Sequence, residues 1–395
     1  MPGFSRWPFL LLAATVLAAC APTHSPGAAA TTSLPSASVS ASAASSSGPA
    51  PELLFGVLES HSKAAEGFPL FDTVAIAGLD GYARAKTTFA PLTPPYVGCV
   101  GPLFPPQGYT AARRVYFIDG KGVVRSLGTD RAVSRVTAFP IGSQQEASFA
   151  VSPDGRHLLG AILTLPPRPS GSSPCSGSGT GFAPGDWSED VYSAEAGGTP
   201  HLISHRQWPQ DQADNVLELV GWVSSGPIAT FPASIGTQGG GPIREGWYGP
   251  VVEIDQASGR VSRTLGSPEC FVRDVIEDGS YACFENTATP AIAVHNRDDS
   301  LSWRAHGNLD LYVPLLAPDR NKVAAQGAVL GRDGSQIQLG LPGADFFSTG
   351  WLDNLTVIGW FGPQPNHLGF VRTATPSRIE DLGFEGTFVG SLQSG

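Results

Sequence analysis

The most regular hydrophobic pattern in the chain is an apolar stretch, a tight polar turn and a second apolar stretch, within residues 148–163. The turn, at residues 153–155, has the sequence Pro-Asp-Gly. Proline presets φ for the second position of a tight turn, aspartate can bond the following backbone, and glycine adopts a positive φ without steric cost. Residues 158–163 are almost continuously apolar, which is typical of a strand covered on both faces. The pattern therefore predicts a buried β-hairpin.

Comparable units return along the chain and are of two kinds. Weaker copies of the first hairpin lie at residues 271–284, 311–325 and 347–361. A second kind, two strands joined by a turn that usually contains glycine, occurs seven times, at residues 74–87, 115–127, 190–204, 251–265, 291–304, 328–339 and 368–382. Hairpins repeated about every 35 to 60 residues predict four-stranded sheets arranged radially. If each hairpin of the second kind supplies the outer pair of strands, there are seven sheets, and six or eight remain open.

The turn at residues 152–155, Ser-Pro-Asp-Gly, and its partial copy at residues 317–319, Ala-Pro-Asp, resemble the repeat of TolB-type and WD40-like bacterial β-propellers. In those proteins this turn joins the first two strands of a blade. The resemblance runs from about residue 68 to residue 392 and implies an all-β chain with a single β-propeller of four-stranded blades, within residues 52–395. The Trp-Asp dipeptide of eukaryotic WD40 proteins is absent. A two-sheet sandwich or two small β domains is the alternative.

Ring closure is expected at the two ends of this domain. A C-terminal strand near residues 387–392 would pair with the N-terminal blade, around Val74, which removes an exposed sheet edge.

The N-terminus has the pattern of an export signal. Arg6 supplies a positive charge, residues 9–19 are mainly apolar, and residues 17–20 read Leu-Ala-Ala-Cys. The apolar run is shorter than the roughly 20 residues that span a hydrocarbon core. The stretch resembles the lipobox of bacterial lipoproteins, which implies that residues 1–19 are removed and that Cys20 carries the acyl chains that hold the protein in the membrane. An ordinary secretory signal is the alternative.

The composition then changes. Residues 21–51 consist of small and polar residues and prolines without Asp, Glu, Lys or Arg, so residues 20–51 are expected to be a lipidated cysteine followed by a disordered tether. The formal net charge of the whole chain is -10, which disfavours a nucleic-acid partner because phosphate binding needs clustered Lys and Arg. We therefore expect an extracytoplasmic protein that is lipid-anchored to the bacterial cell membrane.

The long links between hairpins are the predicted binding surface. In a propeller the two hairpin turns of a blade lie at one end of the ring and the links lie at the other, so the links at residues 90–112, 164–189, 205–215 and 232–248 gather on one face. Loops on a rigid scaffold often bind ligands, and Trp, Tyr and Arg dominate interface energies. The binding candidates on this face are Trp187, Trp208, Trp247, Tyr248, Arg206 and Arg244. The alternative is that the aromatic rings pack the loops down.

Four cysteines remain besides Cys20. An even number in an exported chain favours disulfides over thiols or metal ligands. Cys270 and Cys283 flank one hairpin and can face each other across two strands, whereas Cys99 and Cys175 lie in long links.

Signals for catalysis are weak. His201 and His205 are four residues apart, a zinc spacing on a helix, but they lie at the end of a predicted strand, so no metal site is expected. No cofactor motif occurs either. We expect a non-catalytic binding or scaffold module for a protein or a cell-envelope polymer. The alternative is a propeller glycosidase or lyase acting through funnel carboxylates, for which Asp211 and Asp214 are the nearest candidates.

Overall fold

The computed structural model describes residues 52–63, 69–93, 104, 108–166, 186–209, 216–231, 250–306, 313–325, 327–340, 346–362 and 367–392. Within these ranges the regular structure is entirely β-strand, with no helix. The strands form five sheets of four strands and one sheet of seven, and every strand pair is antiparallel. The predicted all-β class is confirmed.

The five four-stranded sheets each hold four consecutive strands, and we call them blades 2 to 6 in chain order. Blade 2 consists of β4 (Gly108–Ala111), β5 (Arg114–Ile118), β6 (Val123–Gly128) and β7 (Val133–Ala138). Blade 3 consists of β8 (Gln145–Val151), β9 (His157–Thr164), β10 (Asp186–Glu195) and β11 (His201–Pro209). Blade 4 consists of β12 (Glu218–Val223), β13 (Gly226–Thr230), β14 (Val251–Ile254) and β15 (Val261–Leu265). Blade 5 consists of β16 (Cys270–Val275), β17 (Tyr281–Glu285), β18 (Ala291–His295) and β19 (Leu301–Ala305). Blade 6 consists of β20 (Leu315–Leu316), β21 (Lys322–Ala325), β22 (Ala328–Gly331) and β23 (Gln336–Gln338).

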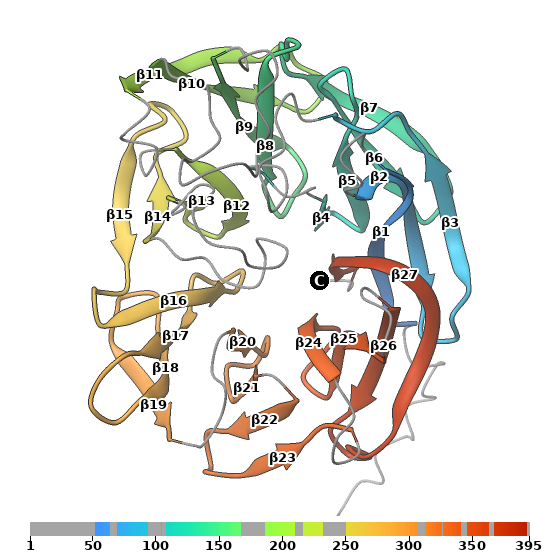
Figure 1. Cartoon of the computed structure of the whole chain (residues 1–395), viewed down its shortest axis with the longest axis vertical. Coiled ribbons are helices and arrows are strands. Elements are labelled where there is room, and N and C mark those ends of the chain that lie inside the picture. The colour runs from blue at the N-terminus through green and yellow to red at the C-terminus, as the bar shows by residue number, and fades with distance from the viewer. Residues whose placement is uncertain are drawn as a thin grey trace, which may run out of the picture. The chain divides into compact units, whose positions relative to one another are not determined.

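The seven-stranded sheet is two blades joined by one long strand. Its order is β24 (Phe346–Trp351), β25 (Thr356–Phe361), β26 (His367–Arg372), β27 (Ile379–Ser391), β1 (Leu54–Lys63), β2 (Pro69–Gly78) and β3 (Ala83–Thr88). Residues 379–385 of β27 pair with β26, and residues 386–391 pair with β1. The first half of β27 is therefore the outer strand of blade 7, and the second half is the inner strand of blade 1. The described strands make a seven-bladed β-propeller (Figure 1).

Closure of the ring by the C-terminal strand is confirmed, but its partner strand differs from the predicted one around Val74. The strand pairs with β1, where Leu58 faces Thr387, and β1 in turn pairs with β2, where Leu58 faces Val74. The sequence pattern missed β1, which lies before the first recognised hairpin. The backbone N–H of Leu392 donates to the carbonyl oxygen of Leu54 at 2.7 Å, so the described ends of the domain meet.

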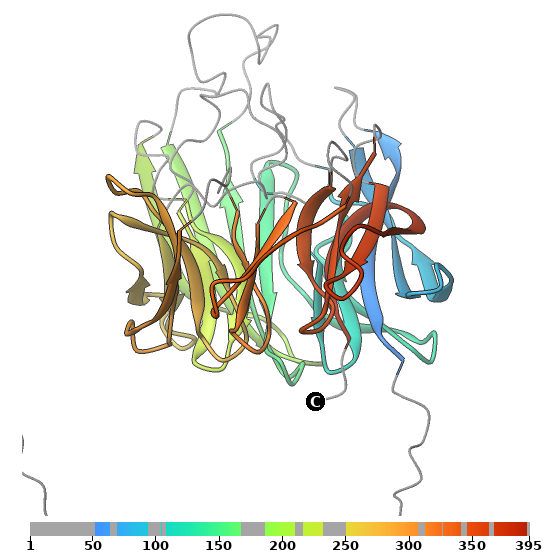
Figure 2. The same cartoon turned by 90° about the horizontal axis from the view of Figure 1, so that it is seen from below.

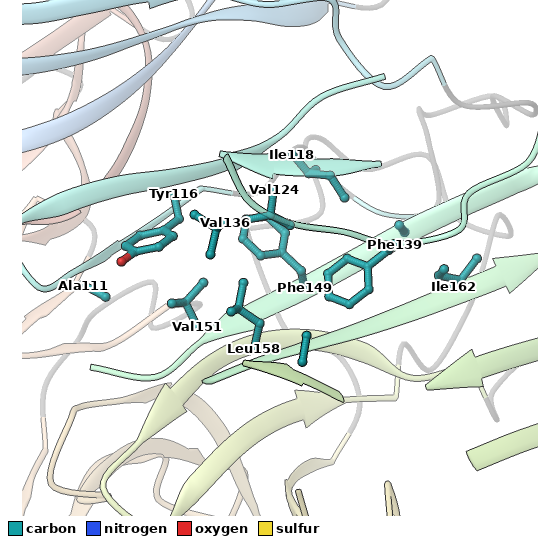
Figure 3. Close-up of a cluster of buried hydrophobic side chains, with 12 residues drawn as sticks. Ala111, Tyr116, Ile118, Val124, Val136, Phe139, Phe149, Val151, Leu158 and Ile162 are labelled. Carbon is teal, nitrogen blue, oxygen red and sulfur yellow. The ribbon is translucent and has the colours of Figure 1, made fainter. Parts of the chain in front are cut away.

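Every blade packs both of its faces against a neighbour. Between blades 2 and 3, for example, Tyr116, Val124 and Phe139 pack against Phe149 and Leu158 (Figure 3). Corresponding clusters lie between the other neighbouring pairs around the ring, including blades 7 and 1. This arrangement explains why the inner strands read as continuous apolar runs, since no face is left to solvent.

The hairpin turns have the expected place. In each blade the first strand lies nearest the centre and the fourth at the periphery (Figure 1). Because the strands alternate in direction, the turns between the first and second and between the third and fourth strands share one end, which we call the turn end. The opposite end, where the links lie, is the loop end, and Figure 2 shows the blades from the side between the two ends.

The hairpin at residues 115–127 is an exception to the predicted outer pairs, because β4 precedes it and makes it the middle pair of blade 2.

The Pro-Asp-Gly turn of blade 3 has the predicted chemistry. Its glycine, Gly155, has a φ of 71° and donates its N–H to the carbonyl oxygen of Ser152 at 2.8 Å. The Asp154 carboxylate accepts bonds from the Ser152 hydroxyl at 2.5 Å and from the Arg156 N–H at 3.0 Å. The residues of this turn are all engaged in shaping the hairpin between β8 and β9.

A test of ring closure uses Gly386, which faces Glu59 where β27 pairs with β1. A Cβ atom at this position would overlap the carbonyl oxygen of Leu58, so Gly386→Ala should separate the two strands and lower the free energy of unfolding by about 2 kcal/mol or more. Gly221→Ala is the matched control, because a Cβ there meets the Ile228 side chain at an ordinary 3.5 Å. Urea unfolding followed by tryptophan fluorescence measures both variants. Equal stability of the two would contradict the closure role.

Candidate functional site

Two of the predicted binding aromatics are core residues. Trp187 on β10 and Trp208 on β11 face each other across the strand pair, and their exposed fractions are 0% and 5%. They pack in a cluster at the loop end of blades 3 and 4 with Phe104, Leu163, Leu165 and Val216. The prediction that these two rings form a binding face is corrected: they hold the loop end of two blades together, as the packing alternative required.

Arg206 is also a packing residue. Its guanidinium forms an ion pair with Glu189, whose carboxylate is completely buried, and lies 5.8 Å from the centre of the Trp208 ring. Glu189 also accepts the backbone N–H of Leu217, so it joins blade 3 to blade 4. Burial raises the pKa of Glu189 to about 7, against the lowering effects of Arg206 and the Leu217 N–H. Arg206 therefore offsets a buried acid in the core and is not directed to a ligand.

The other candidates on the loop end, Trp247, Tyr248 and Arg244, lie outside the described residues. The same holds for Cys20, Cys99, Cys175, Asp211 and Asp214. His201 and His205 lie on β11 as predicted, and His205 pairs with Asp190 at 2.6 Å. The disulfide between Cys270 and Cys283 is confirmed, with its two Cα atoms 5.4 Å apart on β16 and β17.

The described residues place an open hollow of about 600 Å³ at the turn end of blades 4 to 6. Four segments form its wall: the start of β15, the turn between β16 and β17, the turn between β18 and β19, and the turn between β20 and β21. We call it the arginine hollow, and its lining residues are Arg263, Asp278, Ser280, Asn296, Arg297, Asp298 and Arg320. Because it is open to solvent, the arginine hollow is the candidate functional site.

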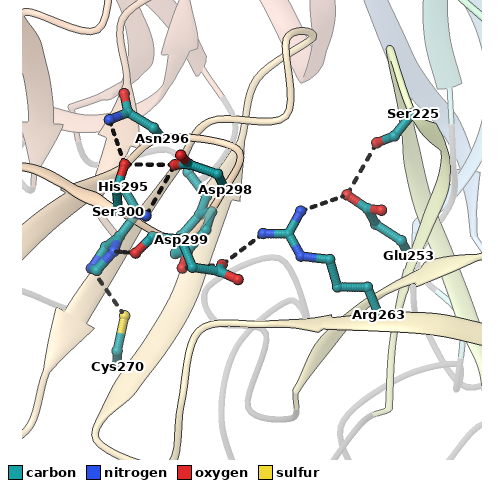
Figure 4. Close-up of polar contacts among 10 residues, drawn as sticks. Ser225, Glu253, Arg263, Cys270, His295, Asn296, Asp298, Asp299 and Ser300 are labelled. Atoms are coloured by element: carbon teal, nitrogen blue, oxygen red, sulfur yellow. Dashed lines mark hydrogen bonds and ion pairs between the residues drawn. The ribbon is translucent and has the colours of Figure 1, made fainter.

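Two of its three arginines are held in ion pairs. The Arg263 guanidinium lies 3.4 Å from the carboxylate of Glu253 and 2.7 Å from that of Asp299, as Figure 4 shows. Arg320 lies 3.3 Å from the carboxylate of Asp278 on the neighbouring turn. The Arg263–Asp299 contact crosses from blade 4 to blade 5, and the Arg320–Asp278 contact crosses from blade 5 to blade 6. They fix the positions of the two guanidinium groups and compensate much of their charge.

The acidic residues of the arginine hollow also have partners. Asp298 accepts bonds from the backbone N–H of Ser300 at 3.1 Å and from its hydroxyl at 2.5 Å, and these bonds lower the pKa of Asp298 (Figure 4). Asp278 accepts the backbone N–H of Ser280 at 2.8 Å in the same way. Both carboxylates therefore shape their own hairpin turns, as expected for Asp residues in turns.

Two polar groups of the arginine hollow are left without such partners. Arg297 is exposed, its aliphatic carbons lie over Gly279, and its guanidinium has no ion pair or hydrogen bond within the described residues. Ser280 is only 1% exposed, and its hydroxyl finds no hydrogen-bond partner in the described part of the chain. A buried hydroxyl without a partner is costly. Of the two, the exposed Arg297 guanidinium is available to a ligand, whereas the Ser280 hydroxyl is enclosed by the protein.

Asp274 joins blades 5 and 6, which both contribute turns to the arginine hollow. Its carboxylate accepts the backbone N–H of Leu316 on β20 at 2.7 Å, which fixes the start of blade 6 and hence the turn that carries Arg320. Burial raises the pKa of Asp274 to about 7, against the lowering effects of the N–H groups of Leu316 and Val275. The acid therefore binds its proton more tightly in the folded protein.

Sequence reasoning missed this site because its residues look like ordinary turn residues. Taken one at a time, Asp278 and Asp298 do not differ from other aspartates of hairpin turns. The three arginines are far apart in the sequence and come together only because consecutive blades are neighbours in the ring. The sequence feature that could have indicated this site is the presence of arginines at or beside hairpin turns of consecutive blades.

Comparisons with known proteins give distant structural similarities only. No protein-family model matches the chain, and no curated protein sequence matches it. Among solved structures, TolB from Acinetobacter baumannii is similar with 13% identity over 86% of this chain and 67% of that chain, at a TM-score of 0.37. A propeller of Dos1 has 9% identity over 87% of each chain, at a TM-score of 0.40. An oligogalacturonate lyase in complex with manganese has 10% identity over 78% of this chain and 86% of that chain, at a TM-score of 0.39.

These similarities concern the fold alone. The blade number and the ring closure rest on the strand pairing within this chain.

The described part of the chain contains no helix that is long and apolar enough to cross a membrane.

The role of Asp274 predicts a pH dependence of stability. Between the ordinary pKa of 3.8 and the folded value of about 7, the folded state keeps a proton that the unfolded state has lost, so the contribution of Asp274 to stability falls as the pH rises through this window. Asp274→Asn keeps an oxygen for the Leu316 N–H without the charge. At pH 8 this variant should be more stable than the wild type, by on the order of 2 kcal/mol after allowance for partial exposure, and the difference should shrink toward pH 4. Urea unfolding between pH 4 and pH 8 measures it, and a difference that stays constant with pH would contradict the assignment.

Proposed function

We propose that the chain is an exported lipoprotein whose propeller is a non-catalytic binding or scaffold module for a protein or a cell-envelope polymer. We further propose that the ligand presents an anionic group to the arginine hollow. The observation that carries this proposal is the exposed guanidinium of Arg297, which lies in a solvent-open hollow and has no ion pair or hydrogen bond within the described residues.

The charge pattern favours an anion over a cation. Both aspartates that line the arginine hollow already accept bonds from their own turns, and Asp278 also pairs with Arg320. A cation would have to compete for these carboxylates. A carboxylate or phosphate can approach Arg297 without breaking an ion pair, and a guanidinium binds such planar or tetrahedral anions with several donors at once.

The loop end remains a second predicted binding surface. Of its six proposed residues, the three that the structure describes are in the core or in a buried ion pair. Trp247, Tyr248 and Arg244 keep their role as a prediction from sequence.

The enzyme alternative needs two carboxylates that a substrate can reach. Glu146 and Glu189 are buried carboxylates at the loop end of blade 3, with exposed fractions of 2% and 0%. However, Glu146 accepts the backbone N–H of Phe104 at 3.1 Å, and Glu189 is bound to Arg206 and Leu217. Their bonds account for a packing role, which favours binding over hydrolysis or lyase chemistry in this proposal.

Anion binding is tested with fluorescein-labelled hexaglutamate as the probe, by fluorescence anisotropy at fixed ionic strength. Arg297→Ala should weaken probe binding by about tenfold, because one charge-assisted contact is lost. Ser280→Ala should bind the probe as the wild type does and should be as stable as the wild type or more so, since the variant removes an enclosed hydroxyl without a partner. Inorganic phosphate should compete with the probe.

The matched control is Arg156→Ala. Arg156 is an exposed arginine at the turn end of blade 3 and does not line the arginine hollow, and 81% of its side chain is exposed. Its removal lowers the net positive charge of the same end by the same amount and should leave affinity unchanged. If Arg297→Ala and Arg156→Ala bind the probe equally well, the arginine hollow is not the site.

Lipid anchoring is tested separately by Cys20→Ala. The variant should incorporate no radiolabelled palmitate and should leave the membrane fraction, because the thiol is the attachment point of the diacylglycerol in the lipobox pattern. Labelling that persists in Cys20→Ala would refute the anchor, whatever the result for the arginine hollow.

A further inference from the structure

One cluster in blade 5 has the composition of a metal site. Cys270 on β16, Cys283 on β17 and His295 on β18 lie on three neighbouring strands, and their potential ligand atoms all lie within 4.8 Å of one another. Cys270 and Cys283 are joined in a disulfide in this structure, and both are buried. His295 is half-buried, and its Nε2 lies 3.8 Å from the sulfur of Cys270 (Figure 4).

The imidazole of His295 is held in one orientation by its surroundings. Its Nδ1 lies 3.0 Å from the backbone carbonyl oxygen of Asp299, and its ring stacks on Tyr281 with an interplanar angle of 5°. The carboxylate of Asp299 accepts the Tyr281 hydroxyl at 2.8 Å, so the hairpin turn braces both rings. The orientation of the imidazole is thus fixed from two sides.

This orientation also decides which nitrogen carries the proton. A carbonyl oxygen only accepts hydrogen bonds, so the neutral imidazole has its proton on Nδ1. The lone pair of Nε2 is then directed at the sulfur of Cys270. Histidines that bind metals are held in the same manner, with the second nitrogen donating to a backbone carbonyl or a carboxylate.

The disulfide does not make use of this lone pair, because a disulfide sulfur has no hydrogen to donate. We propose that in the dithiol state Cys270, Cys283 and His295 bind a thiophilic divalent cation, Zn²⁺. Two thiolates and one neutral imidazole form a ligand set that Zn²⁺ prefers, and the partial exposure of His295 leaves room for a water as the fourth ligand.

An external dithiol converts the Cys270–Cys283 disulfide to the metal-binding state. The dithiol gives two electrons and two protons to the disulfide, the S–S bond breaks, and the reductant becomes a disulfide itself. Binding of Zn²⁺ then releases the two thiol protons of Cys270 and Cys283, while neutral His295 binds without losing a proton. The metal and the disulfide are therefore alternative states of the same two sulfur atoms. This site does not depend on the ligand of the arginine hollow.

The test uses the full chain, reduced with a dithiol, freed of reductant without oxygen and titrated with Co²⁺ as the spectroscopic probe for Zn²⁺. The reduced wild type should show a thiolate-to-cobalt absorption band that Zn²⁺ displaces, and the oxidised wild type should lack this band. Cys283→Ser should lose it. His295→Ala should weaken metal binding at least about tenfold. His306→Ala is the matched control, because it removes an exposed histidine outside the cluster and should bind as the wild type does.

A second measurement does not rely on the cysteine variants. Zn²⁺ should slow the re-formation of the Cys270–Cys283 disulfide in air by several-fold in the wild type and have little effect in His295→Ala, as followed by thiol trapping and peptide mapping. Near-ultraviolet circular dichroism reports whether each variant is folded. A cobalt band that is absent from the reduced wild type, or that is equally strong in His295→Ala, overturns the proposal.

Discussion

The pairing of β27 with β1 is the contact on which the rest of the fold depends. Each blade has two apolar faces, and a ring covers all of them only if the first and last blades also meet. The chain achieves this by letting a single strand serve as the outer strand of blade 7 and the inner strand of blade 1. The close approach needs Gly386, whose missing side chain lets the carbonyl of Leu58 come near. Without that pairing, two blade faces and two sheet edges would be left to water.

The closed ring in turn places the polar turns. Because neighbouring blades are fixed by their shared cores, turns from blades 4, 5 and 6 meet at one end and bring Arg263, Arg297 and Arg320 around one hollow. Asp299 connects this region to the interior, since its carboxylate holds Arg263 and its carbonyl orients His295. Both proposed sites therefore depend on the same hairpin turn of blade 5. The same turn therefore positions groups of the arginine hollow and the imidazole of the proposed metal site.

At the loop end, residue type alone gave the wrong prediction of which aromatic side chains are exposed. Trp187 and Trp208 were assigned to a binding face because they lie at the ends of long links. In the structure both lie inside strands and face each other in the core between blades 3 and 4. The predicted links at residues 164–189 and 205–215 were too long, because β10 begins at Asp186 and β11 continues to Pro209, so both tryptophans belong to strands. Arg206 was misplaced for the same reason. It lies in β11, and its cross-strand neighbour Glu189 holds it in an ion pair.

The sequence by itself determined the class, the repeat and the local turns, because these depend on interactions between residues close in the chain. The alternation of apolar strands with Pro, Asp and Gly at the turns was sufficient for the hairpins, favoured seven blades with six or eight left open, and placed Cys270 and Cys283 where they can face each other; the structure decided the blade number and the pairing. Only the tertiary structure decided that the closing strand pairs with β1, which aromatic residues are buried, and which turn residues share a hollow. These outcomes depend on contacts between blades, where the partners are separated by whole repeats and no local pattern records them.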